Sequence, residues 1–135
     1  MLARMERRII NPWTWQDKFG FVQANEIGGA SRMLVVSGQT SVDPEGRPLH
    51  AGDMAAQASQ ALDNLETVLR QAGYGFADVV RVTYYTTDVD RFIRESGSSL
   101  GRLVQAGCRP ASTLLGVSRL FHPDILLEIE ATAMV

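Results

Sequence analysis

Apolar positions along the chain recur with two periods, one typical of helices and the other typical of strands. Between residues 53 and 72 they fall three or four apart, which predicts an amphipathic helix with one buried stripe. Asp53 is placed to cap the first turn, and Gly73 is placed to end the helix in a left-handed conformation. Residues 90–106 predict a second helix, interrupted by the run of small residues at 96–99. The apolar stripe of the first helix consists of Met54, Ala58, Ala61, Leu62, Leu65, Val68 and Leu69.

Other segments have the alternation or the β-branched content of strands. The predicted strands cover residues 6–10, 19–23, 33–37, 79–87, 112–118 and 125–134. Turn signals separate several of them, including Gly28-Gly29 and residues 44–46. The order β-β-β-α-β-α-β-β predicts an α+β fold built as a two-layer sandwich.

The strand predicted at residues 79–87 is apolar on both of its faces. Val80, Val82 and Tyr84 alternate on one side, and Val79 and Tyr85 lie on the other. Helices in a two-layer fold cover only one face of the sheet. We therefore expect a subunit partner to cover the second face.

Two carboxylates interrupt the apolar strand predicted at residues 125–134. Glu128 and Glu130 share one face with Leu126 and Thr132, opposite the apolar face of Leu127 and its neighbours. A buried carboxylate without a partner is costly, so these acids must be solvated, paired or turned toward a polar cavity. Two interpretations stay open: a solvated or ion-paired sheet face, which is the commoner case, and a pocket in which one acid transfers a proton.

Length, charge and cysteine content narrow the class of protein. The 135 residues fit one domain spanning residues 1–135, and the formal net charge is -2. Arginines are scattered apart from a group at residues 4–8, so we expect no nucleic-acid partner. The single cysteine and the lack of a Cys/His cluster argue against a disulfide framework, a metal or a cofactor. Without an apolar run of membrane-spanning length or a signal-peptide core, we expect a cytoplasmic protein with no membrane contact.

Individual reactive side chains give weaker signals. His50 and His122 both fall in loops, where a lone histidine is more often solvated than catalytic. Cys108 has only Arg109 nearby to favour its thiolate. Trp13 and Trp15 flank a threonine in a loop, and we expect them to pack rather than to line a ligand pocket.

Short segments in a fixed order carry a resemblance to a known family. They are FGFVQ at 19–23, VVSGQ at 35–39, AAQA at 55–58, ALDNL at 61–65, DVVRVT at 78–83, RPAST at 109–113, GV at 116–117 and LEIEA at 127–131. With this order and spacing the chain resembles the reactive-intermediate deaminase (RidA/YjgF) family over nearly its whole length. The resemblance implies a chorismate-mutase-like α+β subunit, with a mixed sheet and two helices on one face. It also implies a homotrimer with a central barrel and three clefts between neighbouring subunits.

The resemblance assigns roles to particular residues. Glu128 matches the family carboxylate that positions or activates the attacking water, so it is the expected catalytic residue. Phe21 matches the aromatic residue that lines the cleft, although it lacks a phenolic hydroxyl. The expected substrate-binding residues are Ser37, Phe21, Ser112, Arg109 and Leu114.

Two positions depart from the family pattern. Members that hydrolyse enamines and imines carry an arginine after the Pro-Ala pair, where it clamps the substrate carboxylate; Ser112 stands there in this chain. Ser96 stands where those members have a pocket asparagine. Whether Arg109 replaces the missing guanidinium stays open.

The sequence therefore predicts hydrolytic deamination of an enamine or imine in an intersubunit cleft. Because the family arginine is absent, we expect an atypical small-molecule substrate, for which an aminomuconate-like compound is one candidate. The alternative is a non-catalytic homotrimer that binds a ligand or another protein.

Overall fold

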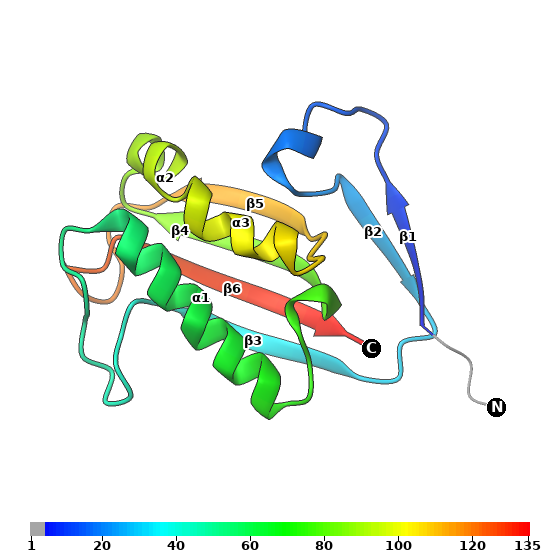
Figure 1. Ribbon diagram of the computed structural model, residues 1–135, viewed down its shortest axis with the longest axis horizontal. Coiled ribbons are helices and arrows are strands. Elements are labelled where there is room, and N and C mark those ends of the chain that lie inside the picture. Colours follow the sequence, from blue (N-terminus) through cyan, green and yellow to red (C-terminus); the bar gives the residue numbers. More distant parts are fainter. Residues whose placement is uncertain (1–4) are drawn as a thin grey trace.

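The computed structural model describes residues 5–135, and its main element is a four-stranded mixed sheet (Figure 1). The strand order is β3-β6-β4-β5. Strand β6 runs antiparallel to both β3 and β4, whereas β5 runs parallel to β4. The strands are β3 (Met33–Gln39), β4 (Val79–Thr86), β5 (Ala111–Gly116) and β6 (Leu127–Met134).

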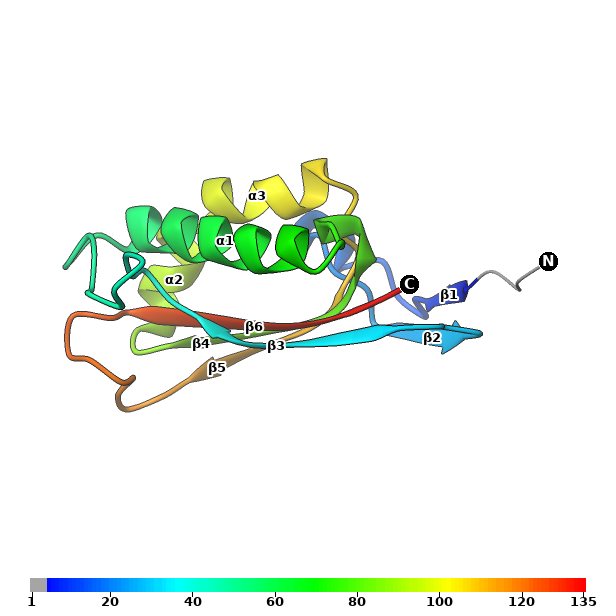
Figure 2. The same ribbon diagram turned by 90° about the horizontal axis from the view of Figure 1, so that it is seen from below.

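Three helices cover one face of this sheet, and no helix of residues 5–135 covers the other face (Figure 2). They are α1 (Met54–Gln71), α2 (Val89–Glu95) and α3 (Gly97–Gln105). The predicted α+β two-layer sandwich is confirmed, but the two expected helices are three. The second helix divides at Ser96, whose hydroxyl bonds to the Phe92 carbonyl and so competes with continued helical pairing. In the described part of the chain, no helix is long and apolar enough to cross a membrane.

Helix α1 forms where its periodicity predicts it. The Asp53 carboxylate accepts a hydrogen bond from the Ala56 N–H at 3.0 Å and caps the first turn. Gly73 follows the last turn with a φ of 85°, which a residue without Cβ adopts at little cost. The stripe of α1 packs on β3 and β6 to make the core, except that Val68 stays 36% exposed at its edge.

The predicted strand at residues 19–23 is wrong. Asp17–Phe19 instead forms a 3₁₀ turn (η1), and Gly20 adopts a left-handed φ of 75°, which breaks extended structure. The second strand of the chain is β2 (Ala24–Gly28), which pairs with β1 (Glu6–Ile10) as a separate two-stranded sheet. Val22 forms only an isolated parallel bridge with Ala111, which brings residues 15–22 alongside β5.

Arg7 and Asn25 attach this small sheet to the main one. The Arg7 guanidinium donates to the carbonyls of Ala77, Val79 and Arg109, and its Nε donates to Asn25 Oδ1 at 3.0 Å. Asn25 also donates to the Arg109 carbonyl at 3.0 Å. Part of the basic group at residues 4–8 therefore holds the fold together; Arg4 lies outside the described residues.

Strand β4 does not have the two apolar faces expected for it. The pairing with β6 shifts register between Val79 and Arg81, and this bulge turns Val79 into the same core as Val82. The face without helices then carries Arg81, Thr83 and Tyr85. Its exposed large aliphatic side chains lie on the edge strands, where Met33, Val35 and Leu115 are 59%, 71% and 43% exposed.

Candidate functional site

The residues proposed for the site lie on opposite faces of the sheet. Phe21, Ser112 and Leu114 line a cavity of about 560 Å³ on the helical side. Glu128 lies on the face without helices, because its neighbours Leu127 and Ile129 in β6 are buried in the core and successive residues of a strand point to opposite faces. Arg109 does not line the cavity; its carbonyl accepts hydrogen bonds from Arg7 and Asn25.

The cavity lies between α2, α3, the start of β5 and residues 15–21. Phe92 and Leu103 form buried parts of its wall, each 4% exposed. Its rim is apolar but open to solvent: Trp15, Phe19, Ile93 and Val104 are each between 56% and 60% exposed. Trp15 contacts Phe21 edge to face with ring centroids 5.8 Å apart. Trp15 therefore lines the cavity, contrary to the expectation that it only packs.

Polar groups inside the cavity are few and uncharged. Burial raises the pKa of the Tyr84 hydroxyl far above its usual value, so Tyr84 stays neutral. Ser96 is 1% exposed, and its hydroxyl already donates to the Phe92 carbonyl. Ser112 is half-buried on β5 beside Val82. Among the lining residues only Lys18 carries a charge, and it lies at the exposed rim.

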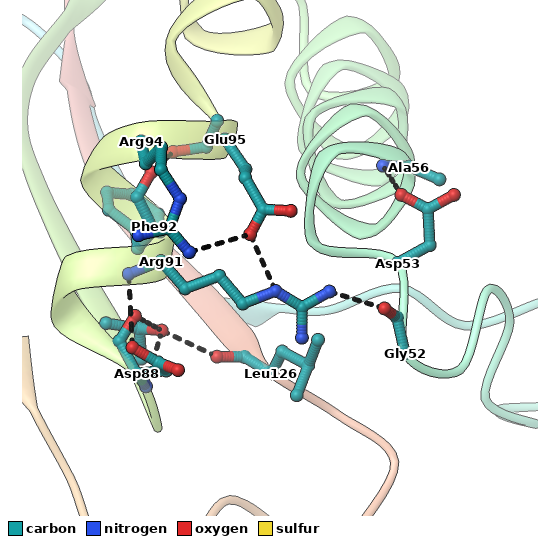
Figure 3. A network of polar contacts seen from close by, with 11 residues as sticks. Gly52, Asp53, Ala56, Asp88, Arg91, Phe92, Arg94, Glu95 and Leu126 are labelled. Carbon is teal, nitrogen blue, oxygen red and sulfur yellow. Dashed lines mark hydrogen bonds and ion pairs between the residues drawn. The ribbon is translucent and has the colours of Figure 1, made fainter.

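An ion-pair network fixes the wall that α2 contributes (Figure 3). Arg91 Nε lies 2.7 Å from Glu95 Oε2, and the Arg91 guanidinium also donates to the Gly52 carbonyl just before α1. The Asp88 carboxylate caps α2 by accepting from the Arg91 N–H at 3.1 Å. These contacts hold α2 against α1 and leave the opposite side of α2, with Phe92 and Ile93, to the cavity.

Glu128 occupies a recess beside the bulge of β3. The pairing of β3 with β6 is irregular between Val36 and Gln39, at Ser37-Gly38. A Cβ at Gly38 would lie only 1.8 Å from Glu128 Oε1, so this carboxylate fits only because residue 38 has no side chain. Burial, and secondarily the negative charge of Glu130, raises the pKa of Glu128 above its ordinary value. Glu128 therefore lies beside Gly38, and Ser37, which precedes Gly38, is exposed.

The second acid on this face has a partner. Tyr85 donates its hydroxyl to Glu130 Oε1 at 2.5 Å, and this hydrogen bond raises the pKa of Tyr85. Arg81, on the same face, donates to Thr113 Oγ1 at 2.6 Å and makes no contact with either acid. Of the two glutamates, Glu128 is the one whose carboxylate has no hydrogen-bond donor among residues 5–135.

The other reactive side chains lie elsewhere. Cys108 is 2% exposed, and burial raises the pKa of its thiol to about 12, so it is not a reactive thiolate. His122 Nδ1 accepts the Asp124 N–H at 3.0 Å within the loop before β6. His50 is exposed and precedes α1 with a φ of 61°. Within residues 5–135 no three His, Cys, Asp or Glu side chains cluster as metal ligands.

Several residues of the cavity were not anticipated from the sequence. Lys18, Ile93 and Val104 reach its rim only because residues 15–22 fold back beside α3 and β5. The sequence signal that could have found two of them is that Ile93 and Val104 are apolar residues off the buried stripes of their helices.

Comparison with known proteins identifies the family. A family model described as Endoribonuclease L-PSP matches residues 18–135. A RutC family protein of Pyrococcus horikoshii is 35% identical over 104 residues, covering 77% of this chain and 80% of the relative. The 2-iminobutanoate/2-iminopropanoate deaminase of Escherichia coli is 32% identical over 115 residues, covering 84% of this chain and 86% of the relative.

A solved structure supports the same assignment. The crystal structure of the Rid family protein YyfB from Yersinia pestis superposes with a TM-score of 0.84 at 35% identity, covering 96% of this chain and 98% of that one. The chain therefore belongs to the Rid/YjgF family of proteins, the group that the Endoribonuclease L-PSP model describes.

Proposed function

We propose that this protein hydrolyses an enamine or imine, with Glu128 as the proton-transferring group. The observation that carries the proposal is the recessed Glu128 carboxylate, whose raised pKa moves it toward the range in which a carboxyl group both accepts and donates protons. The relatives named as imine deaminases support the reaction type.

The reaction needs one water and releases ammonia. Protonation of an enamine at carbon, by solvent, gives the iminium ion, which is the protonated form of its imine tautomer. The ionised Glu128 carboxylate then takes a proton from water as the water oxygen bonds to the iminium carbon, giving a neutral carbinolamine. Glu128 returns that proton to the carbinolamine nitrogen. As the carbon–nitrogen bond breaks, the hydroxyl proton passes to Glu128 and a carbonyl compound and ammonia form; transfer of this proton to ammonia restores the carboxylate.

We propose that the complete site needs two copies of the chain. Glu128 and the cavity lie on opposite faces of one sheet, so within a single chain they cannot act on one bound molecule. A neighbour that brings its Glu128 face to the cavity rim would join them. The exposed rim of Trp15, Phe19, Ile93 and Val104 and the uncovered sheet face both favour such association, and the family resemblance implies a homotrimer.

One observation favours the alternative, a non-catalytic binding trimer. Among residues 5–135 no guanidinium lines the cavity, because Ser112 occupies the position of the family arginine. Ammonia release separates the alternatives. We expect the full-length protein to release ammonia from imines generated in situ from amino acids, and Glu128→Gln to abolish that release while the assembly persists. Ligand binding that is equal in both proteins, with no turnover in either, would support the binding trimer instead.

A further inference from the structure

We propose that the ligand of this cavity is a monocarboxylate with an aromatic or large branched side chain, such as a 2-imino acid derived from phenylalanine or leucine, bound with its side chain inward and its carboxylate facing Lys18. This inference rests on the proposed function for the imino group, but the ligand class follows from the cavity alone.

The first argument is the chemistry of the wall. Aromatic rings reach the cavity from three separate parts of the chain: Trp15, Phe19 and Phe21 from the N-terminal segment, Tyr84 from β4 and Phe92 from α2. Aliphatic residues of α2, α3 and β5 fill the spaces between the rings. An apolar group that leaves water for such a surface binds with a favourable free energy. A small polar molecule obtains no such hydrophobic contribution to its binding.

The second argument is size. A volume of about 560 Å³ lies within the range of about 300–1,000 Å³ typical of pockets for drug-sized ligands. A three- or four-carbon imino acid would leave most of this wall in contact with water. A phenyl or isobutyl group would reach the rings of Phe21, Tyr84 and Phe92.

The third argument is the position of charge. The buried part of the cavity offers only the neutral groups of Ser96, Ser112 and Tyr84, and a carboxylate placed there would lose its hydration without gaining a counter-ion. Lys18 is the one charged lining residue, its ammonium lies 5.1 Å from the Phe19 ring centroid at the rim, and within residues 5–135 it forms no ion pair. The acid group of a ligand is therefore best accommodated at the rim and the apolar group inside.

Binding of stable 2-oxo acids to the full-length protein tests the ligand class without needing turnover. We expect phenylpyruvate to bind at least about tenfold more tightly than pyruvate, the effect of burying a phenyl group. Gly101 lines the cavity, and a Cβ there would meet no atom within 4 Å. Gly101→Leu should therefore fill the space and remove the preference, whereas Gly28→Leu, on the distant β1–β2 sheet, should keep it. Equal affinities of the unmodified protein for the two acids would overturn the proposal.

Charge recognition is tested separately at Lys18. Lys18→Met should weaken phenylpyruvate binding by about fivefold at low salt, as expected for a partly exposed ion pair, and Lys18→Arg should restore it. The uncharged amide of phenylpyruvate should bind all three proteins alike. A loss of amide binding in Lys18→Met would show that Lys18 acts by packing and would overturn the assigned orientation. If no imine releases ammonia but the phenylpyruvate preference holds, the proposed reaction is wrong and the ligand class stands.

Discussion

The two faces of the main sheet differ in almost every property that matters for chemistry. The helical side holds a cavity that is apolar and nearly free of charge. The other side presents Glu128, Glu130, Tyr85 and Arg81, and no helix within residues 5–135 lies above them. Both surfaces come from the same strands, because successive residues of a strand point to opposite faces. Under the proposed function, one side binds the substrate and the other transfers protons, so this division supports a site assembled from two copies.

The largest expected effect is on the proton-transferring face. Glu128→Gln should lower kcat by about 10²- to 10⁴-fold, the range for losing a general acid–base group, because the amide cannot exchange the proton. Glu130→Gln is the matched control on the same strand and should retain most activity. Comparable losses of kcat in the two variants would show that Glu128 is not the specific proton-transferring group. Steady-state ammonia release measures both.

The recess at Gly38 supplies a second test. Gly38→Ala should displace the Glu128 carboxylate, because the added Cβ would lie 1.8 Å from Oε1. We expect a fall in activity of at least about tenfold and a loss of about 1–3 kcal/mol in the free energy of unfolding. Gly28→Ala meets no atom within 4 Å and should change neither quantity by much. If Gly38→Ala is as active and as stable as the parent, the carboxylate does not need this recess.

The acid limb of the pH profile sharpens the role of the second glutamate. The proposed mechanism requires ionised Glu128, so kcat/KM should rise with pH through a pKa above that of an ordinary carboxyl group. Burial is the larger cause of the raised pKa of Glu128 and the charge of Glu130 the smaller. Glu130→Gln should therefore lower the pKa that appears in the acid limb of the kcat/KM profile. This pKa should still lie above that of an ordinary carboxyl group. An unchanged limb would mean that the two acids do not interact.

The same pKa shift has a consequence for stability. A carboxyl group whose pKa is raised by folding binds its proton more tightly in the folded state than in the unfolded chain. This tighter proton binding stabilises the folded state fully at pH values below the pKa of the unfolded state. The stabilisation is lost as the pH rises through the pKa of the folded state. Glu128→Gln, which stays neutral, should therefore be at least as stable as the parent at pH 7 in chemical denaturation. Clear destabilisation would indicate that the carboxylate has a stabilising partner.

The smallest expected effect concerns the cavity side. Gly101 lies inside α3 and faces open space, so Gly101→Ala should stabilise the helix by about 0.5–1 kcal/mol through helix propensity. The added methyl group occupies little of the cavity. Gly101→Ala should therefore change the ligand affinity less than Gly101→Leu does. Thermal unfolding together with phenylpyruvate titration checks both statements. Destabilisation would show that position 101 is more crowded than its geometry indicates.

Local pattern predicted the elements whose burial depends on their own periodicity. The stripe of α1, its Asp53 cap and the alternation that turns Glu128 away from the core are all visible in the sequence. The strand predicted at 19–23 is wrong because Gly20 adopts a left-handed conformation where the chain packs on α3; a Cβ there would lie 2.4 Å from Val104 Cγ2. That contact joins residues far apart in sequence, and no local pattern encodes it.

The candidate site was predictable only in part for the same reason. The resemblance indicated Glu128, Phe21 and Ser112, but not that a single chain holds them on opposite faces. The bulge that moves Val79 into the core depends on the pairing of β4 with β6. Lys18 and the rim residues Ile93 and Val104 belong to the cavity only through the fold-back of residues 15–22. Exposure of an apolar side chain is decided by its tertiary neighbours.

The central claim is that the cavity of one copy works with Glu128 of another copy. The most direct test of this claim is to mix two inactive variants. Glu128→Gln keeps the cavity, and Gly101→Phe, which fills the cavity, keeps the carboxylate. If three copies form a ring of three equivalent sites, equal mixing by unfolding and refolding should restore about a quarter of the parental activity, because three-quarters of the assemblies are mixed and each has one intact site. Mixed assemblies, verified by native mass spectrometry, that stay inactive would contradict the claim.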